Sequence, residues 1–557
     1  MRRPDDILTV PQFAEVDSGF TLPLPSAPLL CGGVTMRSIT LIGSSLCVFV
    51  FCTESVLAER PNLSSARDQA AALQSELVGG PFQGICTSST AFGSNAMANC
   101  DSTVLPHNET AVAVDPNNPA HLLAGSNDTE LVSGNAKTAL GYYTSFDGGR
   151  TWLNGQVPNA GFAQTADPAV GFDRLGNAYY AIIAFDLGLG GQALGGAIQV
   201  SRSSDGGQTF ETPVTVEEST SDAIFEDKPY LVVDTNPGSP FLNSVYIVWT
   251  RFHFNSADSY LESPIFFSAS RDGGRTWSSP MEISGANRAV CTFSGTSLPY
   301  DGRCKEDQFG SPVVGADGTL FVAFENGQAL NDGNFRSQYL VVKSSDGGTT
   351  WNPPVRASDI IRDGVSDYPI NVNGRQTLSN SQFRVNSAGN LSIDPTRGTL
   401  FIVWSDNRNG TAPDTNTDVF IASSSDGGAT WSSPRNIARP GDQFYPWGAV
   451  GPDGTLNVSF MDRSYDPANS KYGITLARLP IRGSGPLQRV DTGLSDPNHA
   501  RWFSSRTNGK TTFLGDYTGL AVGSDGIAHP VWTDMRRVVS VRDITGTNED
   551  IFAAAVP

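Results

Sequence analysis

Carboxylate and guanidinium side chains recur close together along this chain of 557 residues. Three combinations of an aspartate with an arginine each follow a run of apolar residues: Asp406 with Arg408, Asp462 with Arg463, and Asp534 with Arg536. Carboxyl groups can serve as general acid, general base or nucleophile in glycoside hydrolysis. A guanidinium fork matches the geometry of a carboxylate ligand. These residue types therefore suit a site that binds or cleaves a glycan.

More charged residues stand just before apolar runs: Glu109, Asp167, Glu226, Asp227, Lys228, Asp307, Arg384, Asp442 and Asp516. Tyr517 follows Asp516 in "DYTGL". Its phenol has an ordinary pKa of about 10, so as a nucleophile it would need a neighbouring carboxylate as base. The same oxygens also suit a structural Ca²⁺, which takes six to eight oxygen ligands. They suit salt bridges that brace the fold as well.

One phrase that must help to position these residues occurs five times. It reads "SFDGGRTW" at 145–152, "SSDGGQTF" at 203–210, "SRDGGRTW" at 270–277, "SSDGGTTW" at 344–351 and "SSDGGATW" at 424–431. The Asp-Gly-Gly centre predicts a tight turn, because glycine tolerates the positive φ that such turns need. Strand-forming residues flank each copy. The phrase therefore predicts a hairpin between two strands, closed by a large aromatic ring.

A second pattern occurs seven times and consists of a strand, a turn and another strand. Its anchoring aspartates are Asp115, Asp173, Asp234, Asp317, Asp394, Asp453 and Asp525. Together with the hairpins, it predicts an all-β fold, a β-propeller of seven four-stranded blades. The chain ends after the third strand of the last unit, so we expect residues 99–105 to supply the fourth. A six-bladed propeller with one unit as an accessory hairpin is the alternative.

The repeated hairpin phrase resembles the Asp-box, or bacterial neuraminidase repeat, of the sialidase superfamily. The resemblance covers about residues 108–557, and "FLGDYTGLAV" and "PVWTDMR" are similar to segments of exported sialidase-like proteins. Sialidases have six blades, with the Asp-boxes on the face away from the active site. The resemblance therefore implies that strand-one starts and strand-two ends form the working face.

The resemblance also implies site residues: a tyrosine nucleophile, an acidic helper, an aspartate acid/base and three arginines. Tyr517, with Asp516 beside it, is similar to the nucleophile's setting in the family. We expect Asp227 as the acid/base, with Asp462 as second choice and Glu325 as a further catalytic candidate. Arg408, Arg463 and Arg536 occupy equivalent positions in three successive blades and match the three arginines, and Arg384 is a further substrate-binding candidate nearby. The Arg-Ile-Pro motif of the family is absent, and no arginine lies between Arg67 and Arg150. We expect a sialidase-like glycoside hydrolase that requires no cofactor. A non-catalytic glycan- or protein-binding propeller and a polysaccharide lyase are the alternatives.

The formal net charge of −19 argues against nucleic acid or an anionic membrane as the main partner. Residues 36–58 resemble a secretory signal, with cleavage after Ala58, and residues 1–35 precede it. Its apolar stretch of about 15 residues is short for a membrane span of roughly 20. We therefore expect a secreted protein, extracellular or periplasmic, without a membrane span after signal removal.

The cysteines and the repeats together divide the chain. Cys86, Cys100, Cys291 and Cys304 follow the signal in two close pairs. In an exported chain, the simplest of the three pairings is 86–100 with 291–304. We expect a leader (1–58), an N-terminal extension with a disulfide loop and the closing strand (59–107), and the propeller (108–557).

Overall fold

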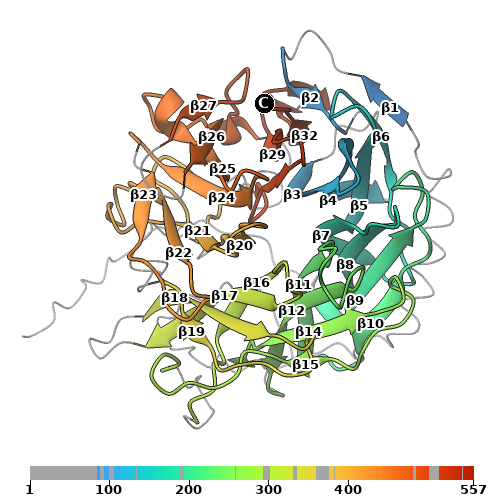
Figure 1. The fold of residues 1–557 in the computed structure, drawn as a ribbon. Coiled ribbons are helices and arrows are strands. Elements are labelled where there is room, and N and C mark those ends of the chain that lie inside the picture. Colours follow the sequence, from blue (N-terminus) through green and yellow to red (C-terminus); the bar gives the residue numbers. More distant parts are fainter. Residues whose placement is uncertain are drawn as a thin grey trace, which may run out of the picture. The chain divides into compact units, whose positions relative to one another are not determined.

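The computed structural model describes residues 84–87, 93–99, 106–132, 135–187, 193–256, 259–292, 301–329, 335–358, 376–381, 383–437, 439–480, 485–500, 513–541 and 544–557. All of them belong to one compact unit, which spans Gly43–Pro557. Seven four-stranded blades form a ring in a β-propeller (Figure 1). We use the word channel for the axis around which the innermost strands lie. The predicted all-β fold with seven blades is confirmed, and the six-bladed alternative is not observed.

Each blade runs antiparallel from an inner strand at the channel to an outer edge strand (Figure 1). Blades one to three are β3 (His107–Asp115), β4 (Asn118–Val132), β5 (Asn135–Ser145), β6 (Thr151–Gln156); β7 (Gln164–Phe172), β8 (Ala178–Leu187), β9 (Ala193–Ser203), β10 (Val214–Ser219); and β11 (Ile224–Val233), β12 (Val245–Phe254), β14 (Ile265–Ser270), β15 (Met281–Glu282). Blades four to six are β16 (Asp307–Val314), β17 (Leu320–Ala329), β18 (Phe335–Ser344), β19 (Val355–Arg356); β20 (Asn390–Ile393), β21 (Leu400–Asp406), β22 (Asp418–Ser424), β23 (Arg435–Ile437); and β24 (Gln443–Val450), β25 (Leu456–Asp462), β26 (Gly473–Leu479), β27 (Leu487–Arg489). Blade seven contains β28 (Gly519–Val522), β29 (Ala528–Asp534), β32 (Asp550–Ala553) and β2 (Ala96–Met97).

Short elements decorate these blades. β13 (Tyr260–Glu262) pairs with β12, and β30 (Val538–Val541) pairs with β31 (Ile544–Thr547). Two single-turn 3₁₀ helices, η2 (Arg463–Tyr465) and η3 (Pro497–His499), follow strands of the later blades. Among the described residues, no helix has the length and apolarity that a membrane crossing requires.

The N-terminal segment closes the ring by pairing with the C-terminal one. β2 lies antiparallel to β32, with Ala96 opposite Ala553 and Met97 opposite Phe552 (Figure 1). The closing strand therefore comes shortly before the predicted residues 99–105, of which 100–105 lie outside the described residues. Asn99 contributes its side chain instead, since its amide oxygen accepts a hydrogen bond from the Ile551 N–H at 2.7 Å.

A fifth strand of blade one was not predicted from the sequence. β1 (Gly84–Thr87) pairs antiparallel with β6, so that Cys86 lies opposite Trp152. The side chain of Cys86 and all of Cys100 lie outside the described residues, and so does the predicted leader. The 86–100 disulfide therefore remains a prediction. The structure does join Cys291 to Cys304, with their Cα atoms 5.0 Å apart.

Tryptophans of the second strands form much of the packing between blades. Trp249, Trp404 and Trp532 occupy matching positions in β12, β21 and β29, and each is at most 1% exposed. Every residue of β21 and of β29 is buried. Strands covered on both faces read as continuous apolar runs, which explains "LFIVW" in the sequence. This packing holds the inner strands in place around the channel.

The Asp-Gly-Gly phrases form the predicted hairpins at one end of the blades. In blade four, Ser344 donates to Asp346 Oδ1 at 2.8 Å, and Asp346 Oδ2 accepts from the Thr350 hydroxyl at 2.6 Å. Gly347 and Gly348 have φ of 69° and 92°, which a residue with a Cβ rarely adopts. Hydrogen bonds from Thr350 and Ser344 lower the pKa of Asp346 to about 2. The aspartate thus stabilises the turn in which it lies.

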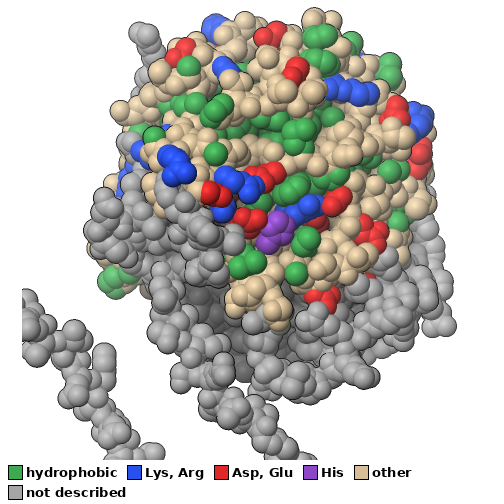
Figure 2. All heavy atoms as spheres, turned by 90° about the horizontal axis from the view of Figure 1, so that it is seen from below, with side chains coloured by type: hydrophobic (Ala, Val, Ile, Leu, Met, Phe, Trp, Pro, Cys, Tyr) green, Lys and Arg blue, Asp and Glu red, His purple; other side chains and the backbone are tan. Residues whose placement is uncertain are grey.

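Charges of both signs alternate on the side of the molecule that Figure 2 shows, which is the bottom of Figure 1. Separately from this view, two ion pairs lie in blade three. Arg251 binds Glu226, and His253 binds Glu262 at 2.9 Å. On this side, basic residues therefore do not form a separate patch.

Candidate functional site

The inner strands share a bulge at the end of the blades opposite the hairpins. The pairing register shifts at this point in blades one, two, three, four and six. A non-glycine residue with positive φ lies in each bulge: Glu109, Asp167, Lys228, Phe309 and Tyr445. Such backbone conformations are uncommon and cost energy, so they persist where the surrounding fold imposes them, often at functional sites. We call this end of the channel the mouth.

Three carboxyl groups of the mouth form a connected set, which we call the acid cluster: Glu109, Asp167 and Asp227. They come from blades one, two and three, and their exposed fractions are 3%, 7% and 8%. Asp167 forms side-chain hydrogen bonds with Glu109 and with Asp227. Two carboxyl groups can share a hydrogen bond only when one of them carries a proton.

Burial governs the ionisation of the acid cluster. It raises the pKa of Asp167 and of Asp227 to about 6, against the opposing charge of Lys228. Burial also raises the pKa of Glu109 well above its ordinary value, and the charge of Asp167 adds to this effect. Carboxyl groups that stay protonated to about pH 6 can act as general acids near neutral pH.

Asp516 and Arg384 lie next to the acid cluster. The Asp516 N–H donates to Glu109 Oε1 at 3.1 Å. Arg384 donates two hydrogen bonds to the Asp516 carboxylate, one from Nη2 to Oδ2 and one from Nε to Oδ1 at 2.8 Å. The Tyr445 hydroxyl donates to the Arg384 carbonyl at 2.7 Å, which helps to hold this segment at the mouth. The structure therefore brings together Asp227, Asp516 and Arg384 of the predicted site.

Tyr517 also lies at the mouth, below the ammonium group of Lys228. The Lys228 Nζ atom lies 2.8 Å from the centroid of the Tyr517 ring, and Tyr517 is 4% exposed. Trp447 connects Tyr517 to Tyr230, with ring centroids 6.3 Å and 5.3 Å apart. These three rings come from blades seven, six and three, so they reach across the channel. We call them the aromatic floor.

The other three predicted arginines are each engaged by carboxylates of the surrounding blade. Arg408 Nε donates to Asp406 Oδ1 at 2.8 Å, and Arg536 Nε donates to Asp534 Oδ1 at the same distance. Arg463 is fully buried and contacts Asp442 at 3.4 Å. Their guanidinium groups thus brace the fold in this structure. The proposed role of these arginines in substrate binding remains a prediction.

Asp462 and Glu325 lie in second strands rather than in the acid cluster. Asp462 is fully buried in blade six, where Oδ2 accepts from the Thr475 hydroxyl at 2.6 Å and pairs with Arg439 at 2.8 Å. Glu325 lies in β17, opposite Gln308 and Tyr339, and is 8% exposed. Their catalytic roles likewise remain predictions.

The mouth includes residues to which the sequence assigned no catalytic or binding role. Glu109, Asp167 and Lys228 were placed on the working face only as charged strand-one starts. A usable signal was present, because Glu109, Asp167, Lys228 and Tyr517 all stand two residues before the apolar run of an inner strand. The bulge that gathers their side chains has no such signature.

The described residues contain no recognisable metal site. Within the described ranges, no group of three or more His, Cys, Asp or Glu side chains is arranged to hold a metal ion. The structural Ca²⁺ considered from the sequence therefore remains a prediction without a site.

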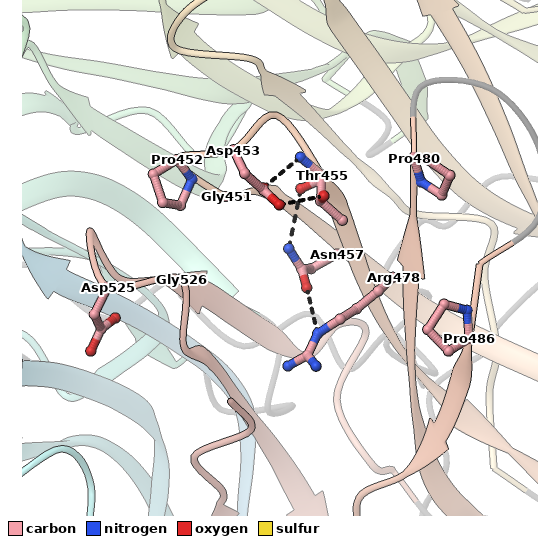
Figure 3. A pocket seen from close by; sticks show the side chains of 10 residues that line it. All are labelled: Gly451, Pro452, Asp453, Thr455, Asn457, Arg478, Pro480, Pro486, Asp525 and Gly526. Carbon is pink, nitrogen blue, oxygen red and sulfur yellow. Dashed lines mark hydrogen bonds between the residues drawn. The ribbon is translucent and has the colours of Figure 1, made fainter.

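A pocket of about 490 Å³ lies at the opposite end of the propeller, between blades six and seven. It is lined by Gly451, Pro452, Asp453, Thr455, Asn457, Arg478, Pro480, Pro486, Asp525 and Gly526 (Figure 3). Asp453 accepts two hydrogen bonds from Thr455, and Asn457 accepts one from Arg478 at 3.4 Å. Because these polar groups already form hydrogen bonds with one another, we place the candidate site at the acid cluster.

The matches of this chain among known proteins are matches to solved structures. No protein-family model matches the chain, and no curated protein matches it in sequence. Among solved structures, the NanB sialidase of Streptococcus pneumoniae is 8% identical with a TM-score of 0.41, over 87% of this chain and 96% of its own. A Hadza microbial sialidase is 14% identical with a TM-score of 0.40, over 83% and 94%. An α-L-arabinofuranosidase of Fusarium graminearum is 12% identical with a TM-score of 0.41, over 70% and 93%. At these values the likenesses identify no function for this chain.

Proposed function

We propose that this protein is an exported propeller enzyme that hydrolyses glycosidic bonds at the mouth. The observation that carries the proposal is the acid cluster beside Tyr517, in which burial raises the pKa of all three carboxyl groups. Asp227 is the general acid, because its pKa of about 6 keeps it protonated in mildly acidic conditions. Its Oδ1 atom is buried without a hydrogen-bond partner among the described residues.

The proposed reaction uses the residues of the mouth in two steps. Asp227 donates its proton to the glycosidic oxygen as the bond to the leaving group breaks, and Tyr517 Oη bonds to the sugar carbon. A neighbouring carboxylate takes the phenol proton. Asp227, now ionised, accepts a proton from water, whose oxygen displaces Tyr517 Oη from the sugar carbon and releases the sugar. The neighbouring carboxylate returns its proton to Tyr517 Oη. The aromatic floor would support the apolar face of the sugar ring.

A sialidase is the narrower form of this proposal. It requires cationic side chains for the sugar carboxylate, for which the sequence suggests Arg384, Arg408, Arg463 and Arg536. Arg384 is the member of this set that lies beside the acid cluster, through Asp516. Sialosides therefore belong in any substrate panel.

A non-catalytic glycan-binding propeller is the second candidate. This alternative is favoured because Arg384 is already paired with Asp516, and the carboxyl groups of the acid cluster are already bonded to one another. Such groups can bind a sugar without transferring a proton to it.

A panel of aryl glycosides tests the proposal, with the wild-type protein compared with Asp227→Asn. Asp453→Asn at the opposite pocket is the matched control. We expect cleavage of at least one glycoside, reduced at least about 100-fold in Asp227→Asn and retained in the control. If the wild type cleaves none, glycoside hydrolysis is wrong, and a glycan array then tests binding alone.

A further inference from the structure

The ammonium group of Lys228 has an unusual environment. The Nζ atom is buried and makes no hydrogen bond to any described residue. Its described contact is the face of Tyr517, at 2.8 Å from the ring centroid. A buried ammonium without acceptors loses the hydrogen bonds that water gives it, which costs free energy. A ligand oxygen beside Nζ would restore one of these bonds.

The remaining charges of the mouth restrict the kind of ligand. Arg384 is occupied by Asp516 through two hydrogen bonds. The charge of Lys228 acts on all three members of the acid cluster, Glu109, Asp167 and Asp227. A negatively charged ligand group bound beside Lys228 would be repelled by any ionised member of the acid cluster.

We propose that Lys228 donates a hydrogen bond to a hydroxyl group of an uncharged sugar, so that the mouth selects neutral over acidic glycans. This inference rests on the proposed glycoside hydrolase, because it names the substrate class of the same site, and it stands against the narrower sialidase form. A sugar hydroxyl can accept from the ammonium and donate to a carboxylate at once, which an anionic group cannot do. The aromatic floor is suited to the opposite, apolar face of such a ring.

Kinetics of Lys228→Met test the hydrogen bond. Methionine keeps an unbranched stem over Tyr517 but removes the three N–H donors. We expect KM for the best neutral aryl glycoside to rise at least about tenfold, with a smaller change in kcat. Lys228→Arg, which keeps donors and charge, should recover part of the loss. Asp453→Asn is the unchanged control, and the melting temperature of each variant shows whether it is folded.

Charge selection is tested with matched pairs of neutral and acidic aryl glycosides, such as glucoside and glucuronide, together with a sialoside. A preference of the wild type for the neutral member supports the inference. Preferred cleavage of the acidic member overturns it and leaves the proposed hydrolase intact. Unchanged KM in a folded Lys228→Met variant also overturns it.

Direct binding separates failure of the inference from failure of the hydrolase. If no glycoside is cleaved, a glycan array is probed with the wild type and with Lys228→Met. Binding to neutral glycans that is lost in the variant supports Lys228 as a sugar ligand although the enzyme proposal fails. Binding only to acidic glycans, equal binding by both proteins, or no binding overturns the inference.

Discussion

Lys228 of blade three reaches Tyr517 of blade seven, so that its Nζ atom lies 2.8 Å from the centroid of the tyrosine ring. The contact spans the mouth, because Lys228 lies in β11 of blade three and Tyr517 lies just before β28 of blade seven. It places a cation against the residue for which we propose nucleophilic attack. Electrostatic attraction between an ammonium and a ring face stabilises this arrangement.

Tyr517→Phe should abolish turnover while leaving the melting temperature nearly unchanged. Phenylalanine keeps the ring that contacts Lys228 and Trp447, but it lacks the oxygen that attacks the sugar. Steady-state kinetics and thermal unfolding of the same preparation measure the two effects. Retention of full turnover would exclude Tyr517 as the nucleophile.

Arg463→Met should destabilise the protein far more than Arg408→Met. Arg463 is fully buried, pairs with Asp442 and donates to the carbonyls of Ser379 and Asn469. Its removal takes the counter-cation from a buried carboxylate and a donor from two carbonyls, which should cost about 3 to 5 kcal/mol. Arg408 is partly exposed and pairs with Asp406, which also accepts from Trp404. Denaturant unfolding measures the difference. Equal stability of the two variants would contradict the bracing role of Arg463.

Trp152→Ala tests whether the hairpins serve the architecture. Trp152 is 1% exposed and its indole N–H donates to the Gly149 carbonyl at 3.0 Å. Its removal should cost about 3 to 5 kcal/mol of unfolding free energy, as for other large core aromatics. The kcat of the folded variant should be unchanged, because the hairpins lie at the end opposite the mouth. A stable variant without activity would assign the hairpins a functional role.

Stability should fall as pH rises from about 4 to 6. The pKa values of Asp167 and Asp227 are raised to about 6 in the folded protein, so the folded state holds protons that the unfolded state has already released. The stabilisation from these bound protons is complete below the ordinary pKa of an aspartate. It is lost as the pH rises through the raised pKa of the folded state. Melting temperatures across this range measure it, and Asp167→Asn with Asp227→Asn should flatten the profile. An unflattened profile would assign the pH dependence to other groups.

The blades could be predicted because their signals are local. Asp-Gly-Gly demands positive φ at two glycines, and apolar runs such as "LFIVW" predict strands covered on both faces. Ring closure was harder, since the identity of the closing strand depends on contacts between residues about 450 positions apart. The segment was correctly predicted to be N-terminal, although its residues are 96–97.

The candidate site could be predicted only in part. Arg408 and Arg536 occupy equivalent positions, which suggested that they converge on one ligand. Each nevertheless has an aspartate two residues earlier, and in the structure this local partner engages the guanidinium. The acid cluster depends on bulges that turn Glu109 and Asp167 toward each other. These bulges have no characteristic sequence pattern from which they could have been predicted.

The pH dependence of kcat/KM tests the central claim most directly, with the best glycoside as substrate and Asp227→Asn beside the wild type. The acid cluster predicts that wild-type kcat/KM declines above about pH 6, approaching tenfold per pH unit, as the general acid loses its proton. The residual activity of Asp227→Asn should lack this decline. A wild-type rate that stays constant from pH 5 to 8, or an identical profile in the variant, would contradict the assignment of the active site to the mouth.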